Sequence, residues 1–475
     1  MAGSFSKLPA RRQPPGSPLH GPPQQLERSR VESRAARPQA DAAPRYQALC
    51  AHQMEPLVAA ELRGLPEVTD VQEGPGAVSF AGPVAALYRA NLYLRCASRV
   101  VQLLSDTPCA GTDELYAAAR ALPWEDFMRP DGTLAVSARG LLPGLDNSMY
   151  AALRVKDAVC DRFRDRYGVR PGIDVRQPMV RINVQLYDAR AMRSPGSHGR
   201  DGHQQVEPRC ALSLDSSDPA LHQRGYRQGG GDAPLKETLA AAIIALSGYP
   251  ELGPGLDSAT DHARQGAGSD PHAVDPTSPG ADLGSRAAGE LPPLVDLCCG
   301  SGTLLCEGGL RALGMAPGLS RQFGFMAWRS FDAGLWQRLK KEAQEQQRAA
   351  SGPFLFGADL DGRVLQTAQR SLEAAGLMKY ARLACGDLRD AEPPPGPGGV
   401  VICNPPYGER LGNAAELVEL YRGLGDTLKR RFVGYTAYVF TANLALGRQI
   451  GLRPSARHVL YNANLEGRLL QFKLY

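Results

Sequence analysis

The sequence predicts an α/β fold, a doubly wound sheet in the C-terminal half of the chain, with a smaller α+β region before it. After Pro293 the hydrophobic pattern reads strand, helix, strand, helix, strand, strand, helix, strand. That order is typical of a parallel sheet covered by helices on both faces. Four of these strands end in a polar residue, and those residues are Asp296, Asp359, Asp387 and Asn404.

The length and composition of the chain limit the kinds of protein that it can be. The chain has 475 residues, 43% of them hydrophobic and 22% charged, so it is long enough for two or three packed domains. Its net charge of +5 permits a nucleic-acid partner without requiring one. No apolar run approaches the length of a membrane span, so we expect no membrane contact. The ten cysteines include no C-x-x-C pair, which favours a reducing compartment and no metal site.

Three segments lack the pattern of a packed domain. Residues 1–43 are basic and rich in proline, which is typical of a disordered tail or of an organelle transit peptide. We therefore expect a cytoplasmic protein, or a chloroplast or mitochondrial one if this tail is a targeting signal. Residues 193–208 and 250–293 are rich in Gly, Pro, Ser and Asp, and we interpret both as insertions.

The N-terminal region mixes short elements. Val84–Leu104 suggests a helix followed by a strand, and Thr133–Gly140 and Met179–Tyr187 read as strands. Asn147–Gly168 reads as an amphipathic helix closed by a glycine. Its apolar stripe is expected at Tyr150, Leu153, Val159 and Phe163.

The stretch LVDLCCGSGTLLCEGGL, residues 294–310, predicts a strand, a tight glycine turn and a helix. Gly300 and Gly302 would let the backbone approach a ligand, and Ser301 and Thr303 could cap the helix. Asp296 stands at the strand end, where its carboxylate could meet a cationic or amine group. The bland alternative is an ordinary strand-to-helix turn.

Two further strands end in acids. Asp359 follows FLFGA and is placed to hold ribose hydroxyls, while Asp361 could instead cap the next helix. Asp387 could accept from an adenine amino group, or it could cap the segment that follows it. Between these units and the glycine turn lies an inserted helical stretch, 314–350, whose Trp328 and Trp336 we expect to pack rather than bind.

The fourth strand leads into Asn404, Pro405, Pro406 and Tyr407. The exocyclic amine of a nucleobase is a poor nucleophile, because its lone pair is delocalised into the ring. Two acceptors, the Asn404 amide oxygen and the Pro405 carbonyl, could receive both amine hydrogens and favour an attacking, pyramidal nitrogen. The prolines would hold these acceptors in place. Tyr407 offers a face on which a flipped base could stack.

Basic residues gather in the N-terminal region. Between Tyr150 and Arg190 there are nine Lys and Arg against five Asp, an excess of +4 that suits phosphate contacts. The alternative is a solvated helix with local ion pairs. The residues that we expect to contact RNA are Arg154, Lys156, Arg162 and Arg181, together with Arg224 and Arg227 further along.

The motifs DLCCGSGT, GADLD, GDL and NPPYGERLG resemble those of class I S-adenosylmethionine-dependent methyltransferases that modify amino groups. LHQRGYR and APLKETLAAAII narrow the resemblance to the THUMP-domain-containing rRNA guanine-N2 methyltransferases that act on large-subunit rRNA. The resemblance covers roughly residues 45–475. It implies a ferredoxin-like domain over 44–105, a THUMP RNA-binding domain over 106–192, and a Rossmann-like methyltransferase domain over 209–475.

The same resemblance assigns roles to the strand ends. Asp296, Gly300, Ser301, Gly302 and Thr303 would line the methionine end of S-adenosylmethionine, Asp359 would hold its ribose and Asp387 its adenine. Asn404, Pro405, Pro406 and Tyr407 would hold the target base. Alternatives are an adenine-N6 or tRNA guanine-N2 methyltransferase, methylation of a protein glutamine, and an RNA-binding protein whose methyltransferase domain is inactive. The sequence leaves the oligomeric state open.

Overall fold

The protein is described here by a computed structural model. It describes residues 43–142, 145–188, 208–227, 229, 235–249, 290–408, 414–462 and 465–475. Residues from Ala43 to Tyr475 form one compact unit. The expected tail and the two expected insertions lie almost wholly outside the described residues. No helix among the residues described is long and apolar enough to cross a membrane.

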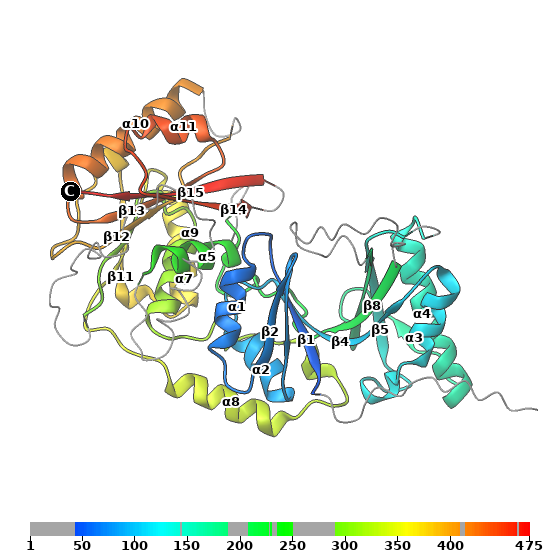
Figure 1. Ribbon diagram of the computed structural model, residues 1–475. Helices are drawn as coiled ribbons and strands as arrows, with labels where there is room; N and C mark the ends of the chain where they lie inside the picture. Colours follow the sequence, from blue (N-terminus) through cyan, green and yellow to red (C-terminus); the bar gives the residue numbers. More distant parts are fainter. Residues whose placement is uncertain are drawn as a thin grey trace, which may run out of the picture. The chain divides into compact units, whose positions relative to one another are not determined.

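The N-terminal region is built on one eight-stranded sheet with the order β2-β3-β1-β4-β8-β7-β5-β6. Most neighbours are antiparallel, whereas β5 runs parallel to β6 and to β7. The bounds are β1 Arg45–Leu49, β2 Thr69–Gly74, β3 Ala77–Ala81, β4 Arg99–Pro108, β5 Thr133–Arg139, β6 Gly172–Ile173, β7 Val180–Asp188 and β8 Pro208–Asp215. Figure 1 shows these strands in blue to green, with β4 leading from the blue half of the sheet to the cyan half.

Helices cover this sheet: α1 Glu55–Arg63, α2 Val84–Tyr93, α3 Thr112–Ala121, η1 Trp124–Asp126 and α4 Ser148–Tyr167. The expected helix and strand within Val84–Leu104 are confirmed as α2 and the start of β4. The expected ends of α4 are also confirmed: the Asn147 side chain accepts from the backbone of Met149 and Tyr150, and Gly168 is left-handed.

The expected apolar stripe of α4 is half wrong. Val159 and Phe163 are buried, but Tyr150 and Leu153 are 49% and 46% exposed. The buried face instead continues through small residues such as Ala151. Small side chains allow the helix to lie close to the sheet, so the larger residues one position away face outward.

The boundary expected at residue 209 is also wrong. Residues Pro208–Asp215 form β8, which pairs antiparallel with both β4 and β7 of the N-terminal sheet. Because β8 joins the two halves of that sheet, the N-terminal region extends to Asp215, and the C-terminal region begins after it.

The C-terminal region holds a seven-stranded sheet with the order β11-β10-β9-β12-β13-β15-β14. The first five strands are parallel, as predicted, and an antiparallel hairpin of β15 and β14 completes one side. The bounds are β9 Leu294–Asp296, β10 Leu355–Asp359, β11 Ala381–Cys385, β12 Val400–Cys403, β13 Thr436–Thr441, β14 Ala456–Asn462 and β15 Leu465–Lys473.

The helices of this region are α5 Glu237–Ser247, α7 Thr303–Ala312, η2 Gly324–Ala327, α8 Ala333–Glu345, α9 Gly362–Ala374, η3 Met378–Tyr380, η4 Leu388–Asp390, α10 Ala414–Arg431 and α11 Leu444–Gln449. Two apolar cores flank the sheet. One packs α10 and α11 against β12, β13 and β15, and the other places α5, α7 and α9 on the opposite face. The arrangement positions the carboxyl ends of β9 to β12 along a single edge.

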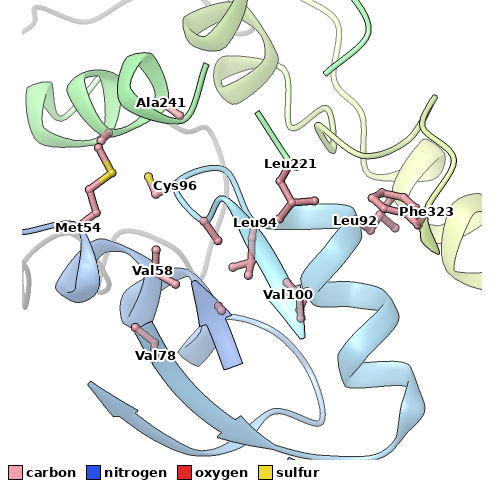
Figure 2. Packing of buried hydrophobic residues seen from close by; sticks show 14 of the residues in the cluster. Met54, Val58, Val78, Leu92, Leu94, Cys96, Val100, Leu221, Ala241 and Phe323 are labelled. Atoms are coloured by element: carbon pink, nitrogen blue, oxygen red, sulfur yellow. The ribbon is translucent and has the colours of Figure 1, made fainter. Parts of the chain in front are cut away.

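The second of these cores continues into the N-terminal region. Figure 2 shows Met54 and Cys96 below α5, which carries Ala241, and it shows Leu92 beside Phe323. The inserted stretch 314–350 contributes to the same contact: Trp328 and Trp336 are buried, and the Tyr88 ring stacks on Phe325 at 4.4 Å between centroids. The prediction that these tryptophans pack is therefore confirmed.

Candidate active site

The glycine turn connects β9 to α7. Gly300 and Gly302 both have left-handed backbone, with φ of +53° and +79°. A Cβ on Gly302 would lie 3.2 Å from the Ala368 Cβ of α9, so glycine satisfies both the dihedral and the close approach. A Cβ on Gly300 would meet no described atom within 4 Å, which leaves that side of the turn open to a ligand.

The expected capping of α7 by Ser301 and Thr303 is not observed. Gly302 occupies the N-cap position, and it has no side chain with which to cap the helix. Thr303 is instead the first helical residue, and its Oγ1 lies 3.3 Å from the Ser301 Oγ. The first backbone N–H groups of α7 are therefore not occupied by a side-chain cap and can meet an anionic group.

Asp296 closes β9 and is buried, with 1% of its surface exposed. Its Oδ1 accepts a hydrogen bond from the Cys298 backbone N–H at 3.1 Å. Burial raises the pKa of the Asp296 carboxyl to about 8; the Cys298 hydrogen bond opposes this shift, and the charge of Asp359 reinforces it. Such a carboxyl is poised to ionise when a cationic group arrives.

Asp359 closes β10, the neighbouring strand. Its Oδ2 accepts from the Gly300 backbone N–H at 2.9 Å, and its Oδ1 accepts from the Asp361 backbone N–H at 3.1 Å. Asp361 itself caps α9 by accepting from the Arg363 backbone N–H at 2.8 Å. Asp361 therefore takes the capping role that the sequence allowed for it, and Asp359 holds the glycine turn. The contact of Asp359 with a ribose stays a prediction.

Asp387 follows β11 and caps η4, since its side chain accepts from the Arg389 backbone N–H at 2.9 Å. It also forms an ion pair with the Arg389 side chain, which holds the pKa of the Asp387 carboxyl below its ordinary value. This is the capping alternative that the sequence left open. Its carboxylate oxygens retain lone pairs, so an adenine contact stays a prediction.

Asn404 follows β12 directly, at the centre of the edge. The Asn404 Oδ1 atom is buried and has no hydrogen-bond partner in the described part of the chain. A buried acceptor of this kind costs roughly 1–3 kcal/mol, which makes a functional partner the simplest explanation. Pro405 is buried, and the Tyr407 ring packs edge-on against Phe440 at 6.3 Å. The structure therefore brings all four strand ends to one edge of the sheet.

The basic residues expected to contact RNA all have protein partners. Arg224 is the clearest departure: only 3% of it is exposed, and its guanidinium binds Glu307, so it is not an RNA ligand in this structure. Arg227 forms an ion pair with Glu237. The other four also form ion pairs. Arg154–Asp113, Lys156–Asp157 and Arg162–Glu125 lie within the N-terminal region, and Arg181 pairs with Asp218, just after β8. Their contact with RNA stays a prediction.

The structure points to two residues that the sequence did not single out. Leu360, between Asp359 and Asp361, is 74% exposed at the edge that carries the site. Arg139 ends β5 and is exposed, two residues before the exposed Leu141. An apolar residue directly after the strand-end acid was the available signal for Leu360, whereas nothing in the sequence distinguishes Arg139 from other arginines.

Within the described residues, no group of three or more metal-binding side chains is found.

The fold and the four strand ends define a class I methyltransferase, preceded by an N-terminal region of two parts. Three family profiles match the chain: an RlmL ferredoxin-like domain at 45–101, a THUMP domain at 109–192 and an RMKL-like methyltransferase domain at 288–471.

Individual relatives agree with these matches. "Ribosomal RNA large subunit methyltransferase K/L" of Syntrophotalea carbinolica is 38% identical over 91% of this chain and 54% of its own length. "Putative RNA methyltransferase slr0064" of Synechocystis sp. is 35% identical over 90% of this chain and 97% of its own length. The chain thus spans about half the length of the K/L relative but nearly all of the Synechocystis protein.

Among solved structures, "SMU.472, a putative methyltransferase complexed with SAH" superimposes with a TM-score of 0.72 at 26% identity, over 91% of this chain and 99% of that one. The protein belongs to the family of THUMP-domain methyltransferases with an RMKL-like methyltransferase domain.

Proposed function

We propose that the protein uses S-adenosylmethionine to methylate the exocyclic N2 amine of a guanine in large-subunit rRNA. The observation that carries the proposal is the Asn404 Oδ1 atom at the end of β12, which is buried and finds no hydrogen-bond partner within the described ranges of the chain. The names of the K/L relatives support the substrate, and the THUMP domain supports RNA.

The residues present fit the cofactor. Gly300 leaves open space on one side of the turn, Asp296 is a buried carboxyl suited to a cationic group, and Asp359 stands at the adjacent strand end. Ser301, Gly302 and Thr303 would complete the methionine end, Asp359 would hold the ribose, and Asp387 and Leu360 would meet the adenine. When bound, S-adenosylmethionine supplies an electrophilic methyl carbon on a sulfonium sulfur.

The chain's own contribution is to prepare the nucleophile. Asn404 Oδ1 and the Pro405 carbonyl would each accept one hydrogen of the target amine, which releases the nitrogen lone pair from the ring. Because the acceptors are fixed before the substrate arrives, they stabilise the pyramidal transition state without reorganising. Tyr407, held against Phe440, would stack on the base after it leaves the helix of the RNA.

RNA binding would fall to the THUMP domain, chiefly through phosphates. Arg139 is exposed, whereas Arg154, Lys156, Arg162 and Arg181 are half-buried and would have to exchange an acid for a phosphate. Arg139→Ala should therefore weaken RNA binding. It should also reduce the slope of log affinity against log salt concentration by about one, the share of one phosphate contact. Filter binding at several salt concentrations measures both quantities.

The function is tested by incubating the protein and radiolabelled S-adenosylmethionine with unmodified rRNA, tRNA and DNA. After digestion, the methylated nucleoside is identified by chromatography. We expect label in N2-methylguanosine from large-subunit rRNA. Label in N6-methyladenine, or in tRNA alone, would replace the proposed substrate, and no transfer to any of the three would overturn the proposal.

A further inference from the structure

The segment Arg224-Gly225-Tyr226-Arg227 links the N-terminal region to the helix that carries the glycine turn. On one side, the Arg224 guanidinium donates to the backbone carbonyl of Arg95, which follows α2. On the other side, its Nε lies 3.3 Å from Glu307 Oε1 in α7, and the Tyr226 hydroxyl donates to the same oxygen at 2.9 Å. Both Arg224 and Glu307 are buried, so α7 is held firmly on this segment.

Arg227 makes the contact nearest the site. Its Nε donates to Glu237 Oε1 of α5 at 2.8 Å, and its Nη2 donates to the Leu235 carbonyl at 2.6 Å. The same Nη2 lies 3.3 Å from the Thr303 Oγ1, in the residue that follows Gly302. One guanidinium therefore connects the start of α5 to the start of α7.

The glycine turn needs such outside support. Two of its residues are glycines in left-handed conformation, and the N-cap residue of α7, Gly302, offers no side chain to cap the helix. Glycines lose more conformational freedom on ordering than other residues do, so an unsupported turn would sample several conformations. Asp359 holds one end through the Gly300 N–H, and Arg227 holds the other through Thr303.

We propose that Arg227 is a positioning residue for the cofactor turn, acting through Thr303 and Glu237 rather than by contact with RNA. This inference rests on the proposed function, since it assumes that the turn binds S-adenosylmethionine. Its loss should raise the Kd for the cofactor and change the turnover rate at saturating cofactor very little. Lysine should restore only part of the affinity, because one ammonium cannot reproduce the planar fork that reaches three acceptors.

The test compares Arg227→Met and Arg227→Lys with the wild-type chain. Calorimetric titration with S-adenosylhomocysteine gives the Kd, and methylation assays separate KM for the cofactor from kcat. We expect Arg227→Met to weaken binding roughly tenfold, as for the loss of one to two net hydrogen bonds, with Arg227→Lys between it and wild type.

Arg99→Met is the matched control. Arg99 also pairs with a buried acid, Asp215, and its side chain is 28% exposed against 19% for Arg227, but among the described residues it makes no hydrogen bond or ion pair with the turn. It should lower the melting temperature and leave the Kd unchanged. An equal rise in Kd for both variants would show a general loss of structure and overturn the inference.

A double-mutant cycle with Thr303→Val covers the case in which Arg227→Met does not fold. Arg227→Lys and Thr303→Val should then show non-additive losses of affinity, because they break the same contact. Additive losses, or unchanged affinity in Arg227→Lys and Arg227→Met, would contradict the positioning role. If the wild-type chain itself binds no S-adenosylhomocysteine, the proposed function fails instead.

Discussion

At the scale of single residues, the Asn404 amide oxygen is buried and has no partner among the residues that the structure describes, while the carboxyls of Asp296 and Asp359 are hydrogen-bonded. Folding alone would favour an apolar side chain at this position, since the orphan acceptor has lost its water. The arrangement is explained if the partner is a substrate N–H that is present only in the complex.

Asn404→Ala tests this explanation. Methyl transfer should fall on the order of 100- to 1,000-fold, because the lost acceptor acts on the transition state. Cofactor affinity should be unchanged, and the melting temperature should not fall, because Oδ1 makes no hydrogen bond in the described chain. Single-turnover methylation, calorimetry and thermal unfolding measure the three quantities. A variant that transfers methyl at nearly the wild-type rate would remove Asn404 from the catalytic centre.

The Asp296 carboxyl should make both the stability of the protein and its affinity for S-adenosylmethionine depend on pH. Burial raises the pKa of its carboxyl from 3.8 to about 8, so the folded chain holds a proton that the unfolded chain has lost. Stability from this group is complete below pH 3.8 and declines as the pH rises towards 8. A cationic ligand favours the ionised form, so affinity for S-adenosylmethionine should rise with pH across the upper part of this range.

Calorimetry in two buffers of different ionisation enthalpy would detect the proton released on binding near pH 7. Asp296→Asn should abolish that release while leaving the turn in place. If proton release persists in this variant, another group titrates and the assignment to Asp296 is wrong.

Asp359→Ala should weaken cofactor binding, but the structure adds a second expectation. Because Asp359 accepts from the Gly300 and Asp361 N–H groups, its loss should also lower stability by about 1–3 kcal/mol. Asp359→Asn keeps a hydrogen-bond acceptor, so its effect on stability should be smaller than its effect on cofactor affinity. Denaturant unfolding with parallel calorimetry measures both effects, and unchanged affinity in both variants would place the ribose contact elsewhere.

At the scale of elements, close packing of α10 against the end of α11 depends on a glycine. A Cβ on Gly425 would lie 1.9 Å from the Ile450 carbonyl oxygen, so the helix can approach only without a side chain there. This contact supports the layer that covers β12, the strand that presents Asn404.

Gly425→Ala should therefore destabilise the protein by about 1–3 kcal/mol, as overpacking of a core does. Gly423→Ala is the control in the same helix, because the three atoms nearest to its Cβ would all belong to the Arg389 side chain, with Cγ at 2.8 Å, and that side chain is mostly exposed and can move. That variant should be close to neutral, since alanine also favours the helix. Urea unfolding of both proteins gives the comparison, and equal stability would contradict the close approach.

At the scale of the whole molecule, the ferredoxin-like part shares a core with the methyltransferase domain. Arg95 donates to the Met315 carbonyl at 2.8 Å, and Arg89 pairs with Glu342 of α8 at 2.8 Å. The two parts therefore pack together and are not independent domains joined by a flexible linker.

Removing residues 43–215 should consequently cost more than RNA affinity. It would uncover the apolar face of α5 around Ala241, which lies beside Met54 in the intact chain, together with Leu221, and it would leave the Arg224 guanidinium without the Arg95 carbonyl. We expect a large fall in melting temperature or aggregation, and with it a loss of cofactor binding. A truncated protein that is monomeric, melts like the full chain and binds S-adenosylhomocysteine normally would show that the shared core is dispensable.

The sequence by itself determined the parallel sheet, the glycine turn, the acids at three strand ends and the Asn-Pro-Pro-Tyr segment. These follow from local rules: strand and helix periods are short-range, and strand ends of a parallel sheet must meet at one edge. Only the tertiary structure decided that β8 belongs to the N-terminal sheet, that Arg224 is buried and that Arg227 supports the turn. Each of those facts depends on which distant segment packs against the residue or strand in question. The charge of a side chain or the period of a strand does not identify that segment.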